Sequence, residues 1–129
     1  MKRILFNKEP KAVPAYPEEV STLTSQQLAD YHAIYTAWYA YISDKLKMFR
    51  LEESKLQFEL GILLRKGLAI ASGKTIKEKE TQVKITDEYL ELESKWFEKK
   101  QICDQLSMEL DTLEKMFMSL RSEMRRREI

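Results

Sequence analysis

The sequence has little of the residues that build catalytic and metal sites. Its 129 residues include one cysteine, Cys103, and one histidine, His32. One cysteine excludes an intrachain disulfide, and this single pair supplies neither a zinc ligand set nor a supported Cys–His nucleophile. We therefore expect neither an enzyme nor a bound metal or cofactor. Cys103 falls on an apolar helix face, so we interpret it as a small buried hydrophobe in a reducing compartment.

The chain also lacks long apolar runs and an excess of one charge. No run reaches the roughly 18 apolar residues of a membrane-spanning helix, and the apolar part of residues 1–6 is too short for a signal peptide. We expect a cytoplasmic protein without a membrane partner, in the host cell's cytoplasm if the protein is viral. The formal net charge is +1, so any affinity for nucleic acid must come from local clusters of cations.

Proline and glycine are scarce. The three prolines, at positions 10, 14 and 17, exclude a continuous helix there, so residues 1–23 are predicted to form an extended or disordered tail. An alternative is that Ile4, Leu5 and Phe6 dock on a neighbouring subunit. The length allows one domain at most, and few glycines suit long helices, so residues 24–129 are assigned to one helical hairpin domain.

A first helix is predicted over residues 24–71. Thr24 and Gln27 have the spacing of a capping box, and apolar residues then recur every three or four positions. Gly73 suits the left-handed residue that often follows a helix. The apolar positions of this helix are Leu28, Tyr31, Tyr35, Trp38, Ile42, Leu46, Phe49, Leu56, Leu60 and Leu63.

Aromatic residues crowd the start of this helix, at positions 31, 35, 38, 39 and 41. Such a cluster can stack nucleic-acid bases, but at helical spacing aromatic side chains more often fill a core or a subunit interface. We favour packing, and we expect Tyr39 and Tyr41 to stay the most exposed of the group.

A second helix is predicted from Thr86 to the C-terminus, because Thr86 followed by Asp87 and Glu88 resembles an N-cap with acids in the first turn. The polar residues 74–84 before it form either a hairpin loop or the frayed start of this helix. One apolar seam runs along the helix in steps of three and four, and only Lys99 interrupts it. The seam consists of Leu92, Trp96, Cys103, Leu106, Leu110, Leu113, Phe117, Leu120 and Met124.

Two long helices of this kind predict an all-α fold, a long antiparallel helical hairpin. A lone hairpin buries too little apolar surface to offset the entropy of ordering its chain, and the seam is wider than one partner helix needs. We therefore expect a homo-oligomer. The residues assigned to its interface are Leu92, Trp96, Leu106, Leu110, Leu113, Phe117 and Leu120.

One segment imitates a nucleotide-binding motif. Residues 67–75 read G-L-A-I-A-S-G-K-T, with five residues between the first glycine and the Gly-Lys pair. A P-loop has four residues there, and it follows a strand in a nucleotide-binding sheet. Here a long helix precedes the segment, so we reject a nucleotide site.

Clusters of cations are the remaining candidates for binding. The arginine-rich C-terminus is one, although cations there also suit the helix dipole. A second basic stretch lies on the first helix and its turn, and it consists of Lys45, Lys47, Arg50, Arg65, Lys66 and Lys74. Surface charge often only aids solubility, but Arg65 and Lys66 have no acid within a helical turn on either side. We interpret these two residues as candidate phosphate contacts.

Several features follow one another over roughly residues 28–127. They are an aromatic-rich helix start, the segment Phe49-Arg50-Leu51-Glu52, basic residues before Ser72-Gly73-Lys74, and a long helix with an Asp-Glu start and an arginine-rich end. This layout resembles the UvsY-type recombination mediator proteins of tailed phages. The resemblance implies closed rings that bind single-stranded DNA and help load a RecA-like recombinase onto strands covered by single-strand-binding protein.

The resemblance also implies which residues contact DNA. The positions that match the family's basic residues are Arg65, Lys66 and Lys74, and we add Arg50 and Lys77 to this DNA-binding set. The sequence departs from the family at Gly67, where the family tends to carry another basic residue.

A structural or adaptor coiled-coil protein, for example a phage assembly factor, is the alternative. It needs the same seam and no nucleic acid, and the near-neutral net charge favours it. A third hypothesis is a regulator that binds a partner's helix through an exposed apolar stripe.

Overall fold

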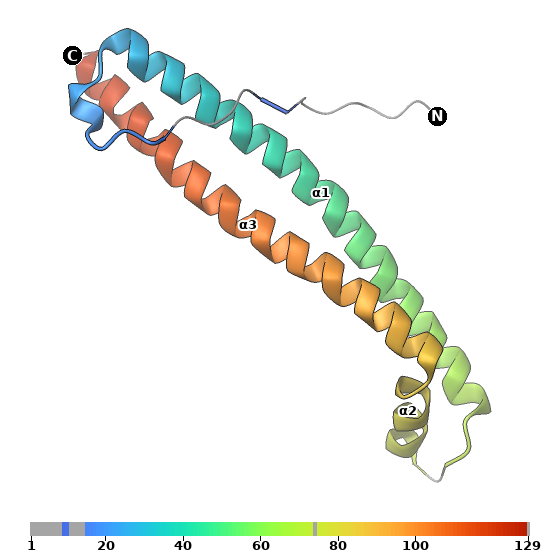
Figure 1. The fold of residues 1–129 in the computed structure, drawn as a ribbon. Helices are drawn as coiled ribbons and strands as arrows, with labels where there is room; N and C mark the ends of the chain where they lie inside the picture. Colours follow the sequence, from blue (N-terminus) through green and yellow to red (C-terminus); the bar gives the residue numbers. More distant parts are fainter. Residues whose placement is uncertain (1–8, 11–14, 74, 129) are drawn as a thin grey trace. The chain divides into compact units, whose positions relative to one another are not determined.

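The computed structural model describes residues 9–10, 15–73 and 75–128, and these ranges contain helices and no strand (Figure 1). A short 3-10 helix, η1 (Val20–Thr22), precedes three α-helices: α1 (Ser25–Ile70), α2 (Ile76–Lys84) and α3 (Asp87–Arg127). The predicted all-α class is confirmed.

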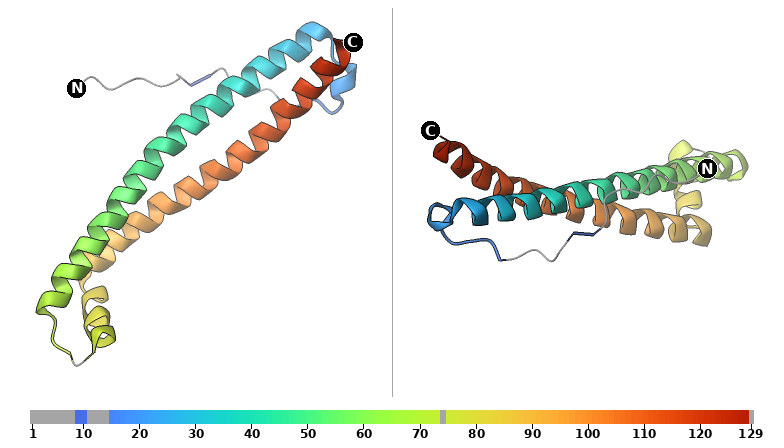
Figure 2. Two further views of the ribbon diagram at one scale, coloured as in Figure 1. Left: turned by 180° about the vertical axis from the view of Figure 1, so that it is seen from behind. Right: turned by 90° about the horizontal axis from the view of Figure 1, so that it is seen from above.

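The described residues divide into two compact units. The first unit combines residues from Met1–Lys47 with residues from Gln105–Ile129, and the second unit is Met48–Asp104. Helix α1 therefore contributes its first half to the first unit and its second half to the second unit. Helix α3 does so in the reverse order, and α2 lies wholly in the second unit (Figures 1 and 2).

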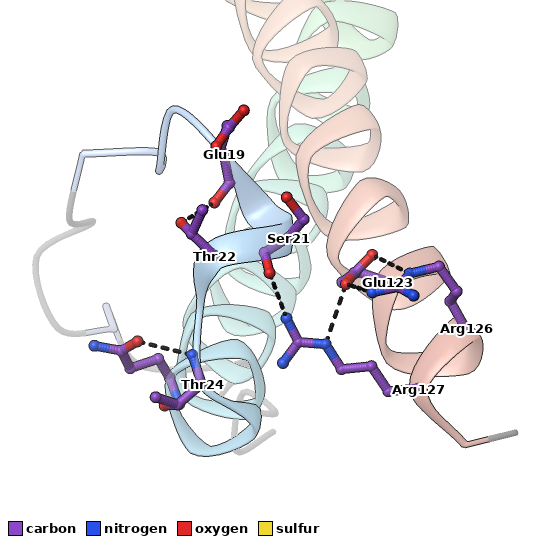
Figure 3. Close-up of polar contacts among 8 residues, drawn as sticks. Glu19, Ser21, Thr22, Thr24, Glu123, Arg126 and Arg127 are labelled. Atoms are coloured by element: carbon purple, nitrogen blue, oxygen red, sulfur yellow. Dashed lines mark hydrogen bonds and ion pairs between the residues drawn. The ribbon is translucent and has the colours of Figure 1, made fainter.

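The start of α1 follows from its capping residues. The Thr24 hydroxyl accepts a hydrogen bond from the Gln27 backbone N–H at 3.1 Å, and the Gln27 side-chain oxygen accepts one from the Thr24 N–H at 2.9 Å (Figure 3). Two backbone donors that the helix leaves unpaired are thereby satisfied. The predicted capping box is confirmed, and α1 begins at Ser25.

The core of the first unit is formed by Leu28 and Tyr35 of α1 and Leu120 of α3. These side chains keep 1%, 1% and 0% of their surface exposed. Full burial of a leucine stabilises a fold by about 1.5–3 kcal/mol. Partly buried residues pack around this core: Tyr16, Val20, Leu23, Tyr31, Leu113, Met116, Phe117 and Met124.

Part of the segment assigned to the tail packs against this core. The Tyr16 ring meets the edge of Tyr35 at 5.7 Å between centroids, and its hydroxyl donates a hydrogen bond to the Met116 carbonyl at 3.4 Å. Residues 20–22 form η1. The assignment of residues 1–23 to a tail stays a prediction, and Ile4, Leu5 and Phe6 lie outside the described residues.

The aromatic cluster is packed, as predicted, and the two members expected to stay the most exposed, Tyr39 and Tyr41, are half-buried. Tyr39 is half-buried and meets the Phe117 ring edge-on at 5.3 Å. Tyr41 is also half-buried, because it lies between the Trp38 ring at 5.6 Å and the Lys45 ammonium at 4.8 Å. The spacing alone could not show this, since the partners come from α3 and from the next turn of α1.

The second unit pairs the end of α1 with the start of α3, and its core consists of Leu60, Val83 and Tyr89. The Trp96 indole N–H donates to the Glu53 carboxylate at 2.9 Å. Glu53 of α1 contacts Trp96 of α3, and the later residue Leu60 packs with the earlier residue Tyr89. The two stretches of helix therefore run antiparallel within this unit.

Lys99, the residue that interrupts the seam, lies on the same face as the apolar seam residues. Its ammonium forms an ion pair with Glu52 at 2.8 Å and lies 4.8 Å from the centre of the Phe49 ring. The aliphatic part of a lysine side chain can pack against apolar residues. The charged end of Lys99 is stabilised by the Glu52 carboxylate and by the Phe49 ring. Every seam residue is buried or half-buried, so the predicted period is confirmed across the interruption.

Residues 76–84 form a separate helix, which neither of the two interpretations of this segment predicted. The Thr75 hydroxyl accepts a hydrogen bond from the Glu78 N–H at 3.1 Å and so caps α2. A threonine followed three residues later by glutamate is a capping signal in the sequence itself. Helix α3 then begins at Asp87, as predicted, and the Thr86 hydroxyl accepts from the Tyr89 N–H at 3.3 Å.

The expectation of a left-handed Gly73 is wrong, because no described residue, glycine or otherwise, has a positive φ. Helix α1 ends at Ile70, and the Gln82 side chain donates a hydrogen bond to the Ser72 carbonyl. A side-chain donor from α2 thus satisfies a carbonyl after the end of α1, a role that a left-handed cap often plays.

Candidate nucleic-acid interface

Arg65 and Lys66 lie on the last turns of α1, in the second unit, and both side chains are exposed. The Arg65 guanidinium donates a long hydrogen bond, 3.4 Å, to the Gly61 carbonyl of its own helix. Within the described ranges neither residue forms an ion pair. Their charges are therefore available to an anion outside the chain.

No contact joins the other described residues of the predicted DNA-binding set to Arg65 and Lys66. Lys77 is exposed on the first turn of α2, after the turn that follows α1. Arg50 is exposed on α1, but it precedes Arg65 by 15 residues, which is about 22 Å of helix. Lys74 lies outside the described residues. The structure thus separates Arg50 from the end of α1.

The sequence leading into this turn carries only positive charge. Between Glu59 and Glu78 the sequence contains four cations and no acid, the cations being Arg65, Lys66, Lys74 and Lys77. Positive charge in such a stretch is not cancelled by its neighbours along the helix. The last turns of α1 and the turn after it therefore form a locally basic stretch, which ends at Glu78 in the first turn of α2, on a chain of near-zero net charge.

The close approach of α2 to α1 depends on one glycine. A Cβ atom built on Gly67 would lie 2.6 Å from one methyl carbon of Val83 and 2.7 Å from the other. Gly67 therefore lets the two helices meet where a larger residue would force them apart. This contact explains why a glycine occupies position 67.

A groove accompanies this contact. It has a volume of about 500 Å³, and Lys66 lies on its wall together with residues of α1, α2 and the first turn of α3. The other lining residues are Leu63, Gly67, Ile70, Ala71, Gln82, Val83, Thr86 and Glu88. The sequence alone does not predict this groove, because the groove depends on how α2 packs against α1.

The second basic cluster, at the end of α3, is used inside the chain. Arg126 donates to Glu123 at 2.9 Å, and Arg127 donates to Glu123 at 3.1 Å and to the Ser21 carbonyl at 3.2 Å (Figure 3). The hydrogen bond from Arg126, with that from Arg127, lowers the pKa of the Glu123 carboxyl to about 2. Arg121 and Arg125 are exposed and belong to no ion pair among the described residues.

Five of the seven residues predicted to form the oligomer interface pack within the chain's own two units. Leu120 is fully buried, Leu113 and Phe117 pack against the first core, and Leu92 and Trp96 pack against the second. Leu106 and Leu110 are half-buried. Other apolar residues are more exposed than these: Leu51, Phe58, Leu90, Phe97, Met108 and Met118. Leu51 and Phe58 are seven positions apart along the chain, as are Leu90 and Phe97.

The P-loop-like segment, the cysteine and the histidine each have a structural explanation. Residues 67–70 of the P-loop-like segment belong to α1 and do not follow a strand. Cys103 is buried, and burial raises the pKa of its thiol. His32 packs edge-on against Phe117 at 6.2 Å. Among the described residues, no three carboxylate, histidine or cysteine side chains gather as metal ligands.

None of the described helices is both long and apolar enough to cross a membrane. Comparisons of the chain with protein-family models, with curated proteins and with solved structures found no match.

Proposed function

We propose that this chain is a non-enzymatic recombination mediator. It binds single-stranded DNA and helps load a RecA-like recombinase onto strands covered by single-strand-binding protein. The observation that carries the proposal is the pair of exposed cations at the end of α1, Arg65 and Lys66, without an acidic partner among the described residues. The proposed DNA-binding set also includes Lys77 on the first turn of α2, together with Lys74 and Arg50.

Cations in this setting bind the phosphate backbone without reading the sequence. Each neutralised phosphate releases counterions, so the affinity falls steeply as salt is added. One small cluster binds weakly. Several copies held in one assembly bind a flexible strand together, and their combined affinity far exceeds that of a single copy.

The assembly in this proposal is a homo-oligomer of helical hairpins, closed into a ring. Its subunit contacts use the exposed apolar residues rather than the buried seam. Leu51 and Phe58 are 73% and 63% exposed one heptad apart on α1, and Leu90 and Phe97 are 48% and 52% exposed one heptad apart on α3. Heptad spacing is the pattern by which helices of separate chains pack lengthwise.

The test of DNA binding is fluorescence anisotropy with labelled oligo-dT at low and at physiological salt. The double variant Arg65→Glu with Lys66→Glu should weaken binding on the order of ten- to a hundred-fold, because two attractive charges become repulsive. The matched control is Lys115→Glu with Arg121→Glu, which makes the same change of net charge on exposed residues of α3. Equal loss in both variants, or no binding at low salt, would contradict the proposal.

The test of mediation uses a recombinase and a single-strand-binding protein from a host that carries this sequence. The chain should shorten the lag before the recombinase hydrolyses ATP on a covered strand, and the Arg65→Glu, Lys66→Glu variant should leave the lag unchanged. A chain that binds DNA but never shortens the lag would be a DNA-binding protein without the mediator role.

A structural or adaptor coiled-coil protein is the second candidate, and the exposed heptad pairs on α1 and α3 are what favour it. Under this alternative the assembly forms through Phe58 and Phe97, and DNA is not a ligand. Sedimentation with and without oligo-dT separates the two functions, since the adaptor assembles to the same mass in both cases and carries no DNA with it.

A further inference from the structure

The groove beside Lys66 has an apolar interior and a mixed rim. Val83 is buried in it and Leu63 is half-buried, whereas Ile70, the last residue of α1, keeps 87% of its surface exposed. An isoleucine so exposed next to a hollow gives the groove an apolar lip. Its volume of about 500 Å³ lies within the range of small-molecule sites and exceeds what one flat heteroaromatic ring fills.

The charges on the rim decide which part of a nucleotide enters. Lys66 and Glu88 both line the groove, and no ion pair joins them. A phosphate inside the groove would gain from Lys66 but would be repelled by the Glu88 carboxylate. The phosphate is therefore favoured outside, towards Arg65 and Lys66, and the neutral part of the nucleotide is favoured inside.

We propose that this groove holds one unstacked base of a single strand whose phosphates lie on Arg65 and Lys66. The inference rests on the proposed function and adds to it a selectivity for single strands. Bases of a single strand are free to enter an apolar site and bury their faces there, whereas bases of a duplex are already stacked and paired. The cations alone would not distinguish the two forms so strongly.

The experiment compares labelled oligo-dT with an abasic strand of the same length and with a duplex, by anisotropy at low salt on the full chain. The first variant is Ile70→Ala, which removes the exposed lip. The matched control is Ile85→Ala, since Ile85 is 67% exposed after α2 and does not line the groove. Circular dichroism verifies that both variants keep their helices.

The unchanged chain should bind oligo-dT about five-fold more tightly than the abasic strand, because one base face buried in the groove removes apolar surface from water. Ile70→Ala should remove most of this preference and leave affinity for the abasic strand as it was, whereas Ile85→Ala should preserve it. Lys66→Gln should lower affinity for both strands alike.

Other outcomes overturn one proposal and not the other. Equal affinity for oligo-dT and the abasic strand refutes the base site but leaves DNA binding in place. Absence of binding to every strand refutes the proposed function itself. A change of sedimentation mass in Ile70→Ala, with strand preference retained, would assign the groove to contact with a second copy and refute the base site.

Discussion

In the first unit Arg126 and Arg127 share the carboxylate of Glu123, whereas in the second unit Arg65 and Lys66 have no acidic partner within the described ranges. The two cores also differ in how completely their side chains are buried. Leu28, Tyr35 and Leu120 are 0–1% exposed, while the central residues of the second unit keep 6–8%. Similar residues therefore form ion pairs inside the first unit and stay without an acidic partner in the described part of the second.

Leu120→Ala should lower the free energy of unfolding by about 2–5 kcal/mol, because it empties a fully buried site in the first core. Leu60→Ala in the second core should cost less, since Leu60 is 8% exposed and its neighbours are nearer to solvent. Urea unfolding at one fixed protein concentration measures both. Equal costs would remove the distinction between a tighter and a looser unit.

Arg65→Gln with Lys66→Gln should flatten the salt dependence of binding to oligo-dT. The slope of log K against log salt should fall by about 1.4, because each lost phosphate contact on a single strand removes about 0.7. Arg126→Gln with Arg127→Gln should leave the slope unchanged, since those cations are held by Glu123. A slope that responds to the second pair would show that both clusters reach DNA.

Gly67→Ala and Gly61→Ala should have opposite signs. At position 61 a Cβ meets nothing within 4 Å, so alanine should raise the free energy of unfolding by up to about 1 kcal/mol through its helix propensity. At position 67 the contact with Val83 should outweigh that gain and lower stability by about 1 kcal/mol or more. Thermal unfolding of the two variants gives the comparison directly. Stabilisation by both would mean that α2 does not pack against α1 at Gly67.

The acid stability of the first unit should depend on Glu123. Its folded-state pKa of about 2 lies below the usual 4.5, so its contribution is fully present above pH 4.5 and is lost as the pH falls towards 2. Glu123→Gln should therefore be less stable than the unchanged chain at neutral pH, and the difference should shrink in acid. Urea midpoints measured across this range test it, and a difference that does not vary with pH would contradict the shifted pKa.

Much of the fold was predictable from local signals. The Thr24 and Gln27 cap, the Thr86 cap and the apolar seam need only neighbouring residues, and each is confirmed. The Thr75 cap of α2 was equally local, but the polar composition of residues 74–84 suited a hairpin loop or the frayed start of the second helix, and neither interpretation included a separate helix. Propensity over so short a segment is weak against capping and tertiary packing.

The rest depends on contacts between distant residues. The register of α1 against α3 decides whether Lys99 can pair with Glu52 and whether Tyr39 can contact Phe117. The apolar periodicity of each helix does not determine this register. The groove depends on the absent side chain of Gly67 and the branched side chain of Val83, a pair 16 positions apart. The exposed cations were predicted because the lack of a nearby acid is visible in the sequence.

The hydrogen bond from Arg127 to the Ser21 carbonyl joins residues 106 positions apart. The beginning and the end of the helical part of the chain therefore meet, as Figure 3 shows. A short glycine-rich connector could link them, and new ends could be opened in the exposed turn after α1, at Ser72 and Gly73. Such a circular permutant would carry its free ends beside the proposed DNA-binding residues, where a fluorophore or a crosslinker could report directly on strand capture.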